Sequence, residues 1–173
     1  MDTIAGHVRE EVGLRRQKTP PSALRDRPLF NLPCRGFEES LQGDSRRIIA
    51  EVKRASPSQG LIRKEFDAVE IARDFTVNGA SALSVLTEER FFQGSLLYLE
   101  RIKKEVPLPL LRKDFIVDGY QLLEARSFGA DAVLFIAALL DPLLLQELKD
   151  QASSLSLDAL VEVHTEAEME YAL

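Results

Sequence analysis

The chain has 173 residues, a formal net charge of −6, 45% hydrophobic residues, 29% charged residues and one cysteine, Cys34, which excludes an internal disulfide. This length and composition fit one globular domain with a substantial core, and the negative charge disfavours a nucleic-acid binder. The longest apolar run, 132–140, is shorter than the roughly 20 residues of a membrane span, and no secretion signal precedes it, so we expect a cytoplasmic protein without membrane contact.

Residues 1–46 differ from the rest and predict an N-terminal helical extension that is too short to bury a core of its own. A polar helix is expected over residues 3–17, and Pro20-Pro21 ends it. Its apolar stripe consists of Ile4, Val8, Val12 and Leu14. Residues 18–46 then read as loop with short helical pieces.

From residue 47 onward the sequence predicts alternating strands and helices. Five short segments are apolar on both faces for most of their length, which is typical of buried parallel strands. Helix starts between them are marked by cap residues with capping-box spacing or a following proline. The strands are expected at 48–53, 82–87, 108–113, 132–137 and 159–164. The cap residues are Asp67, Ser95, Asp118, Asp141 and Thr165.

A short internal repeat indicates a fold built from repeated units. The segment Gly79-Ala80-Ser81-Ala82-Leu83 recurs fifty residues later as Gly129-Ala130-Asp131-Ala132-Val133. Each glycine lies where a helix ends and a strand begins, a position that often needs a left-handed backbone. Alternating strands and helices form a parallel sheet, either open or closed into a barrel.

Charged residues at the ends of three predicted strands favour the barrel. Side chains alternate across a strand, so Glu51 and Lys53 share a face, and Lys113 and Glu162 lie on the core-facing side of their own strands. Charge is costly beside an apolar core, and (β/α)8 enzymes place their sites at the C-terminal ends of the strands. The sequence therefore predicts one site built from these four residues.

The number of strands predicts an incomplete barrel over residues 47–173. A complete (β/α)8 barrel has eight strands and about 250 residues, whereas five strands are expected here. The two outer strands then have unpaired edges, which favour self-association or pairing with a complementing fragment.

Each candidate also has a structural interpretation. Lys113 can act as a general acid, form a Schiff base or bind an anion, and it can also serve only as the ion-pair partner of Asp114 or Glu162. Ser56 either contacts a substrate or shapes the turn, and Phe92 and Phe115 either line a planar substrate or pack in the core. The two histidines of the chain form no metal-binding pattern.

Four segments together resemble the indole-3-glycerol phosphate synthase family, whose members are (β/α)8-barrel lyases of tryptophan biosynthesis. The segments are IIAEVKRASPS at 48–58, LSVLTEERFFQGS at 83–95, LRKDFIVD at 111–118 and LVEVHT at 160–165. The resemblance implies that the substrate is 1-(2-carboxyphenylamino)-1-deoxyribulose 5-phosphate, an anthranilate-ribulose phosphate. Its indole ring is closed with loss of carbon dioxide and water, and no metal or organic cofactor is implied.

The resemblance also implies roles for individual residues. Lys113 matches the general acid that activates the substrate carbonyl, and Glu162 matches the general acid/base of the dehydration. Lys53 matches the lysine that contacts the substrate carboxylate and assists proton transfer, and Glu51 matches the glutamate that orients these groups. The substrate-binding residues implied are Ser56, Phe92 and Phe115.

Two alternative functions stay open at this point. In the family the phosphate is held by loops after the last strands of the barrel, which are missing here, so we expect this chain alone to be impaired. A non-catalytic partial barrel, either a folding fragment or an assembly subunit, is one alternative. Another phosphate-sugar barrel enzyme that uses Lys113 as a Schiff base is the second, although the combination of Glu51, Lys53 and Ser56 argues against it.

Overall fold

Five parallel strands form the centre of the molecule in the computed structural model, which describes residues 2–173 except the side chains of residues 2, 3 and 5. Their order in the sheet is β1-β4-β5-β6-β7, and β2 and β3 form a separate antiparallel pair after β1. The bounds are β1 Ile49–Val52, β2 Ala55–Ser56, β3 Gly60–Leu61, β4 Ala82–Leu86, β5 Leu110–Lys113, β6 Ala132–Ile136 and β7 Asp158–Glu162. The predicted parallel α/β architecture is therefore confirmed over five βα units.

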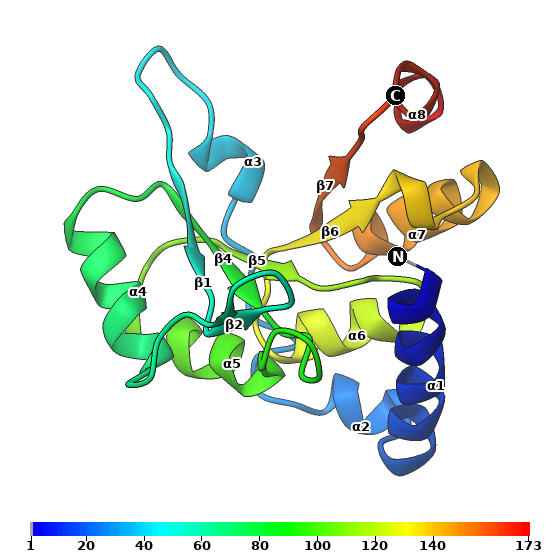
Figure 1. The fold of residues 1–173 in the computed structure, drawn as a ribbon, viewed down its shortest axis with the longest axis horizontal. Coiled ribbons are helices and arrows are strands. Elements are labelled where there is room, and N and C mark those ends of the chain that lie inside the picture. The colour runs from blue at the N-terminus through cyan, green and yellow to red at the C-terminus, as the bar shows by residue number, and fades with distance from the viewer. Residues whose placement is uncertain (1) are drawn as a thin grey trace.

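A helix follows each strand of the main sheet, and Figure 1 shows α4, α5 and α6 along one side of that sheet. The helices are α4 Ala68–Val77, α5 Leu96–Glu105, α6 Gly119–Ser127, α7 Pro142–Ser154 and α8 Glu166–Ala172, with a short 3-10 turn at Ala137–Leu139. Strand residues alternate between two apolar clusters. Leu110 and Val133 belong to the large cluster under the helices, whereas Leu111 and Leu134 belong to a smaller cluster on the opposite face. Burial on both faces is the pattern expected of a partial barrel.

The five predicted helix caps are confirmed, because each cap side chain accepts a backbone N–H bond from the first turn of its helix. Two of the capping boxes have a different reciprocal bond. Gln121 accepts from the N–H of Val117 at 2.9 Å, and Glu168 accepts from the N–H of His164 at 2.6 Å. In both cases the side chain three residues after the cap therefore accepts from the N–H of the residue before the cap, not from the N–H of the cap residue itself. Gly79 and Gly129 both have a φ of +88°, as the repeat predicts.

The N-terminal extension contains α1 (Asp2–Lys18), α2 (Pro21–Arg25) and α3 (Phe37–Ser40). Val8 and Val12 of α1 are buried against the large core cluster, as predicted. The assignment of Leu14 to the same stripe is wrong, because its side chain is 50% exposed. Leu14 lies only two positions after Val12, about 200° around a helix of 3.6 residues per turn, so it faces away from the packed side.

Two aspartates at the starts of strands attach the extension to the barrel. Asp131 accepts from the backbone N–H of Arg35 at 2.7 Å and from Nζ of Lys103 at 2.5 Å. Asp158 accepts from the backbone N–H groups of Phe37 and Glu38 at 2.9 and 3.0 Å. The Phe37 ring then joins the smaller apolar cluster. This part of the extension, around residues 35–40, therefore covers the end of the sheet opposite the predicted site, whereas His7 of α1 contacts Phe91 in the loop after β4.

The outer strands are more exposed than the central ones. β4 and β6 are buried along their whole length, whereas β1 has one buried residue and β7 has none. Ile48, Ile49 and Leu160 are 57%, 37% and 36% exposed. None of the helices formed by residues 2–173 is both long enough and apolar enough to cross a bilayer.

The alkylation rate of Cys34, which lies in the extension, measures how tightly the extension packs against the barrel. Burial raises the pKa of its thiol, although the nearby positive charge of Arg126 opposes this. A raised pKa leaves less thiolate at a given pH, and the thiolate is the nucleophile. At pH 8, iodoacetamide should therefore alkylate Cys34 at least about threefold more slowly in the folded chain than in urea. Intact-mass measurement over time gives both rates, and equal rates would contradict the attachment.

Candidate active site

A cavity of about 330 Å³ lies at the C-terminal ends of the strands. Strand ends of β1, β5 and β7 and the loops after β4 and β5 all contribute side chains to it. The lining residues are Glu51, Lys53, Leu86, Glu88, Phe92, Lys113, Asp114, Phe115, Leu134, Ile136 and Glu162. The structure thus brings all four predicted ionisable residues and both predicted aromatic residues into one cavity.

The four ionisable residues form two lysine–glutamate pairs. Lys113 Nζ donates to Glu162 Oε2 at 3.2 Å, and Lys53 Nζ donates to Glu51 Oε1 at 2.5 Å. The four side chains are each about one-third exposed, so both pairs face the solvent-filled cavity rather than the core. The other oxygen of Glu162 lies 3.4 Å from Nε2 of His164. Because these pairs are partly hydrated, a charged ligand can exchange with either partner at small cost.

Two phenyl rings form an apolar wall beside these charges. The ring centroids of Phe92 and Phe115 lie 6.1 Å apart with an interplanar angle of 47°. Leu86, Leu134 and Ile136 complete the apolar part of the lining. The cavity therefore combines an apolar surface that fits an aromatic ring with two ammonium groups that fit anionic oxygens.

Glu88 folds the loop that carries Phe92, a role that sequence reasoning did not predict. Its carboxylate accepts the backbone N–H groups of Arg90, Phe91 and Phe92 at 3.1, 2.7 and 3.0 Å. Its carbonyl accepts from the N–H of Gly94 at 2.7 Å. The only sequence signal for this arrangement is an acidic residue followed by a glycine six positions later, which is too common to be specific.

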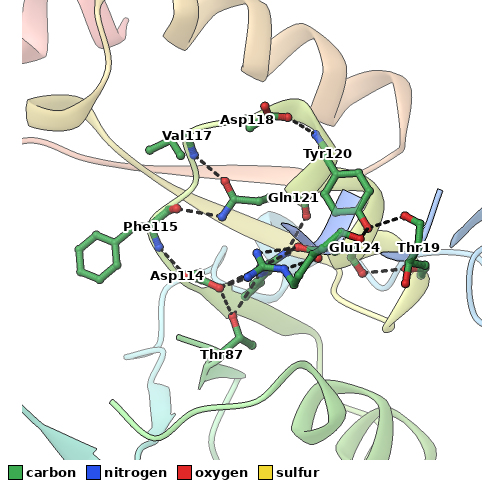
Figure 2. Close-up of polar contacts among 12 residues, drawn as sticks. Thr19, Thr87, Asp114, Phe115, Val117, Asp118, Tyr120, Gln121 and Glu124 are labelled. Carbon is green, nitrogen blue, oxygen red and sulfur yellow. Dashed lines mark hydrogen bonds and ion pairs between the residues drawn. The ribbon is translucent and has the colours of Figure 1, made fainter. Parts of the chain in front are cut away.

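The loop after β5 is folded by Asp114 and Gln121 through contacts that sequence reasoning did not predict, although the spacing did mark Gln121 as the capping-box partner of Asp118. Asp114 Oδ1 accepts from the N–H of Phe115 at 2.8 Å. The amide of Gln121 donates to the carbonyl of Phe115 and accepts from the N–H of Val117, both at 2.9 Å. Figure 2 shows Asp114 and Gln121 on the same, inner side of this turn, with the Phe115 ring projecting away from them on the other side.

Ser56 lies in the β2–β3 hairpin and is not among the residues that line the cavity. Its hydroxyl accepts from the N–H of Gln59 at 3.2 Å and lies 3.4 Å from the hydroxyl of Ser58. In this structure Ser56 therefore shapes the turn, which is one of the two interpretations that the sequence left open. Its contact with a substrate stays a prediction.

Among the side chains that the structure describes, no three of the histidine, cysteine, aspartate or glutamate type are grouped so that they could hold a metal ion. The absence of a metal stays a prediction. The positive groups that face the cavity are the two lysines.

A parallel β/α sheet that presents charged side chains at the C-terminal ends of its strands defines the class of (β/α)-barrel enzymes. The family model described as indole-3-glycerol phosphate synthase matches residues 1–173. The chain therefore belongs to the indole-3-glycerol phosphate synthase family, as the sequence resemblance predicted.

Curated relatives agree with the family match. The proteins named indole-3-glycerol phosphate synthase from Burkholderia multivorans and Burkholderia vietnamiensis are 50% and 49% identical to this chain, over all of it and 67% of their own length. The protein of the same name from Chlorobium phaeovibrioides is 46% identical over all of this chain and 68% of its own length. The chain thus spans about two thirds of the length of the curated relatives that it matches.

Gly94 tests the packing of the loop that carries Phe92. A Cβ atom at this position would lie 2.5 Å from the carbonyl oxygen of Leu86 and 2.8 Å from that of Glu88, so the backbone must move. Gly94→Ala should therefore lower the free energy of unfolding by about 1–3 kcal/mol. Urea unfolding followed by circular dichroism measures the change.

Gly13 provides the matched control for that substitution. It lies in α1, and a Cβ atom there would have no neighbour within 4 Å. Gly13→Ala should raise the free energy of unfolding by about 0.5–1 kcal/mol because alanine is the better helix former. A loss of stability in Gly13→Ala equal to that in Gly94→Ala would contradict the steric explanation.

Proposed function

We propose that this chain carries the catalytic lysine and glutamate residues of an indole-3-glycerol phosphate synthase, a carbon-carbon lyase of tryptophan biosynthesis. The substrate would be 1-(2-carboxyphenylamino)-1-deoxyribulose 5-phosphate, which is a small anion. The single observation that carries this proposal is the cavity in which two lysine–glutamate pairs face two phenyl rings. The family match and the relatives' names support the same reaction.

The chemistry of the cavity suggests how the substrate lies in it. Phe92 and Phe115 form the wall for the anthranilate ring. The ammonium group of Lys53 lies at the first strand end and binds the carboxylate, while that of Lys113 faces the ribulose carbonyl. Each lysine leaves a glutamate partner to make these contacts, so Glu51 and Glu162 become available to orient groups or to move protons.

Ring closure begins when the aromatic carbon that bears the carboxylate attacks the carbonyl carbon of the ribulose chain. Negative charge develops on the carbonyl oxygen, where the ammonium of Lys113 stabilises it and donates a proton. Carbon dioxide then leaves, and its bonding electrons restore the aromatic ring. Loss of water needs a proton donated to the departing hydroxyl and another removed, and Glu162 is the general acid/base of this step.

Three finer features of the proposal concern the rest of the chain. Residues 1–46 form an extension and residues 47–173 the partial barrel in this proposal, because the backbone N–H groups of Arg35 and Phe37 donate to Asp131 and Asp158 at the starts of barrel strands. The exposed β1 and β7 edges are proposed to pair with the remainder of a barrel, since this chain covers 67% of the length of its relatives. A cytoplasmic location, no nucleic-acid partner and no cofactor remain predictions.

Lys113→Met tests the assignment of the general acid. The variant should lower the rate of indole formation by roughly 10²–10⁴-fold, since removal of a positioned acid has that effect. Fluorescence of the indole product measures the rate, and the chain should be mixed with a segment of a relative that carries the remaining strands. Arg73→Met is the matched control, because Arg73 and its partner Glu105 form an exposed ion pair away from the cavity.

The same mixture separates the proposed reaction from its two alternatives. Indole product from the mixture supports the proposal, and its absence with a folded complex favours a non-catalytic partial barrel. Borohydride reduction of a substrate adduct onto Lys113 would instead favour a Schiff-base enzyme.

The 173-residue chain on its own should turn over substrate far more slowly than a complete relative. The described strands supply the lysine–glutamate pairs, whereas complete barrels commonly bind phosphate with the loops after the last two of their eight parallel strands. We expect kcat/KM to rise at least about tenfold when the complementing segment is added, because a phosphate contact adds binding energy in the transition state. A kcat/KM of the isolated chain near that of a complete relative would contradict this.

A further inference from the structure

One buried arginine, Arg112, lies next to the proposed general acid but on the opposite face of β5. Its side chain is 1% exposed and is among the largest fully buried side chains of the described residues. A guanidinium group in the layer between a sheet and its helices is costly unless every donor has a partner. The hydrogen-bond partners of Arg112 therefore indicate the role of this buried positive charge.

The guanidinium of Arg112 makes six hydrogen bonds, and most acceptors belong to the chain that follows Lys113. Nη2 and Nε donate to Asp114 Oδ2 at 2.9 and 3.2 Å. Nη1 donates to the carbonyl of Gln121 at 2.6 Å, and both terminal nitrogens donate to Glu124 Oε2 at 3.3 and 3.2 Å. The sixth bond runs from Nε to Oγ1 of Thr87 at 3.2 Å.

These acceptors hold the backbone on both sides of Lys113. Asp114 is fixed by Arg112 and Thr87, and its second oxygen caps the N–H of Phe115. The carbonyl of Lys113 itself accepts from the N–H of Thr87 at 3.1 Å. Residues 112 and 114 are thus anchored on the helix side of β5, and the Lys113 side chain between them must project to the cavity side.

We propose that Arg112 is a positioning residue, which aims Lys113 at Glu162 and Phe115 at the cavity from the far side of the strand. Gln121 extends this action, because its carbonyl binds Arg112 while its side chain holds the carbonyl of Phe115. Figure 2 shows Asp114, Gln121 and Glu124 gathered around one centre.

Helix α1 completes this network from the N-terminal extension. Arg15 donates to both oxygens of Glu124, at 2.7 and 3.2 Å. Burial would lower the pKa of Arg15, but the hydrogen bond and the charge of Glu124 outweigh it, so the pKa is raised. Arg15 and Arg112 balance the charges of Asp114 and Glu124, and loss of α1 would leave one buried negative charge in excess. The orientation of Lys113 therefore depends on the extension as well as on β5.

This inference rests on the proposed function only where it predicts an effect on turnover. Its main test therefore measures how close the Lys113 ammonium lies to the Glu162 carboxylate. A carbodiimide activates a carboxylate and lets a neighbouring amine displace the urea, which joins the two side chains by an amide bond. Peptide mass spectrometry then gives the yield of the Lys113–Glu162 cross-link. The Lys53–Glu51 cross-link in the same sample is the internal reference, because no bond of the Arg112 network reaches that pair.

The expected result is a graded loss of the Lys113–Glu162 cross-link. Relative to the reference, its yield should fall at least threefold in Arg112→Met and by less in Arg112→Lys, because lysine keeps the charge but cannot reach all the acceptors. Arg15→Met should give a smaller loss of the same sign, and Arg73→Met should give none. Circular dichroism at the reaction temperature identifies variants that are folded.

If Arg112→Met does not fold, Arg112→Lys and Arg15→Met decide the question. A lower urea midpoint in these variants with an unchanged cross-link ratio would assign Arg112 a purely structural role and overturn the proposal. When the complementing segment is present, a positioning role further predicts that kcat falls in Arg112→Lys. The fold-decrease in kcat should exceed the fold-change in KM by at least about fivefold. The cross-link result stands even if no indole product forms, so failure of the proposed function is distinguishable from failure of this inference.

Discussion

The alternation of side chains along β5 is the constraint on which the site depends. Arg112 and Lys113 are adjacent in sequence, yet one guanidinium is enclosed between sheet and helices while the neighbouring ammonium faces an open cavity. Because a strand turns successive side chains to opposite faces, any force that fixes Arg112 also fixes the direction of Lys113. The buried network is therefore a mechanical reference for the lysine, and its guanidinium lies on the opposite face of the strand from the Lys113–Glu162 pair.

The two faces of the strand also differ in electrostatic character. On the helix side, Arg112 is neutralised by Asp114 and Glu124 within 3.3 Å, and the low dielectric makes these contacts strong and rigid. On the cavity side, the Lys113–Glu162 pair is one-third exposed, and water screens it. A rigid pair would be a poor acid or base, because its proton and its charge could not be given to a ligand. The exposed pair can exchange partners, while the buried one keeps it in place.

Sequence reasoning reached the cavity because its charges interrupt apolar runs. Glu51, Lys53, Lys113 and Glu162 each stand at the end of a strand where an apolar residue would otherwise be expected, and period-two alternation assigns them to one face. The five strands and the five helix caps followed from equally local patterns. Glu88, Arg112 and Gln121 could not be found in this way, because their roles depend on partners elsewhere in the fold. Leu14 was assigned to the wrong face because it was included for its hydrophobicity, although its position two residues after Val12 turns it about 200° away from the packed side.

The extension shows why a chain segment without a core of its own still belongs to the site. At one end of the sheet, Asp131 and Asp158 accept backbone N–H groups of residues 35, 37 and 38, and the Arg35 guanidinium donates to the carbonyls of Lys103, Val106 and Leu108, so the extension is attached there by main chain and side chain together. Farther along, Arg15 of α1 reaches Glu124, and the hydroxyl of Tyr120 donates to the carbonyls of Arg15 and Thr19. These contacts bracket α6, which supplies Gln121 and Glu124 to the network around Arg112. A movement of α1 would therefore reach Lys113 through the hydrogen bonds and charges that join Arg15, Glu124 and Arg112, which makes the extension a part of the support of β5.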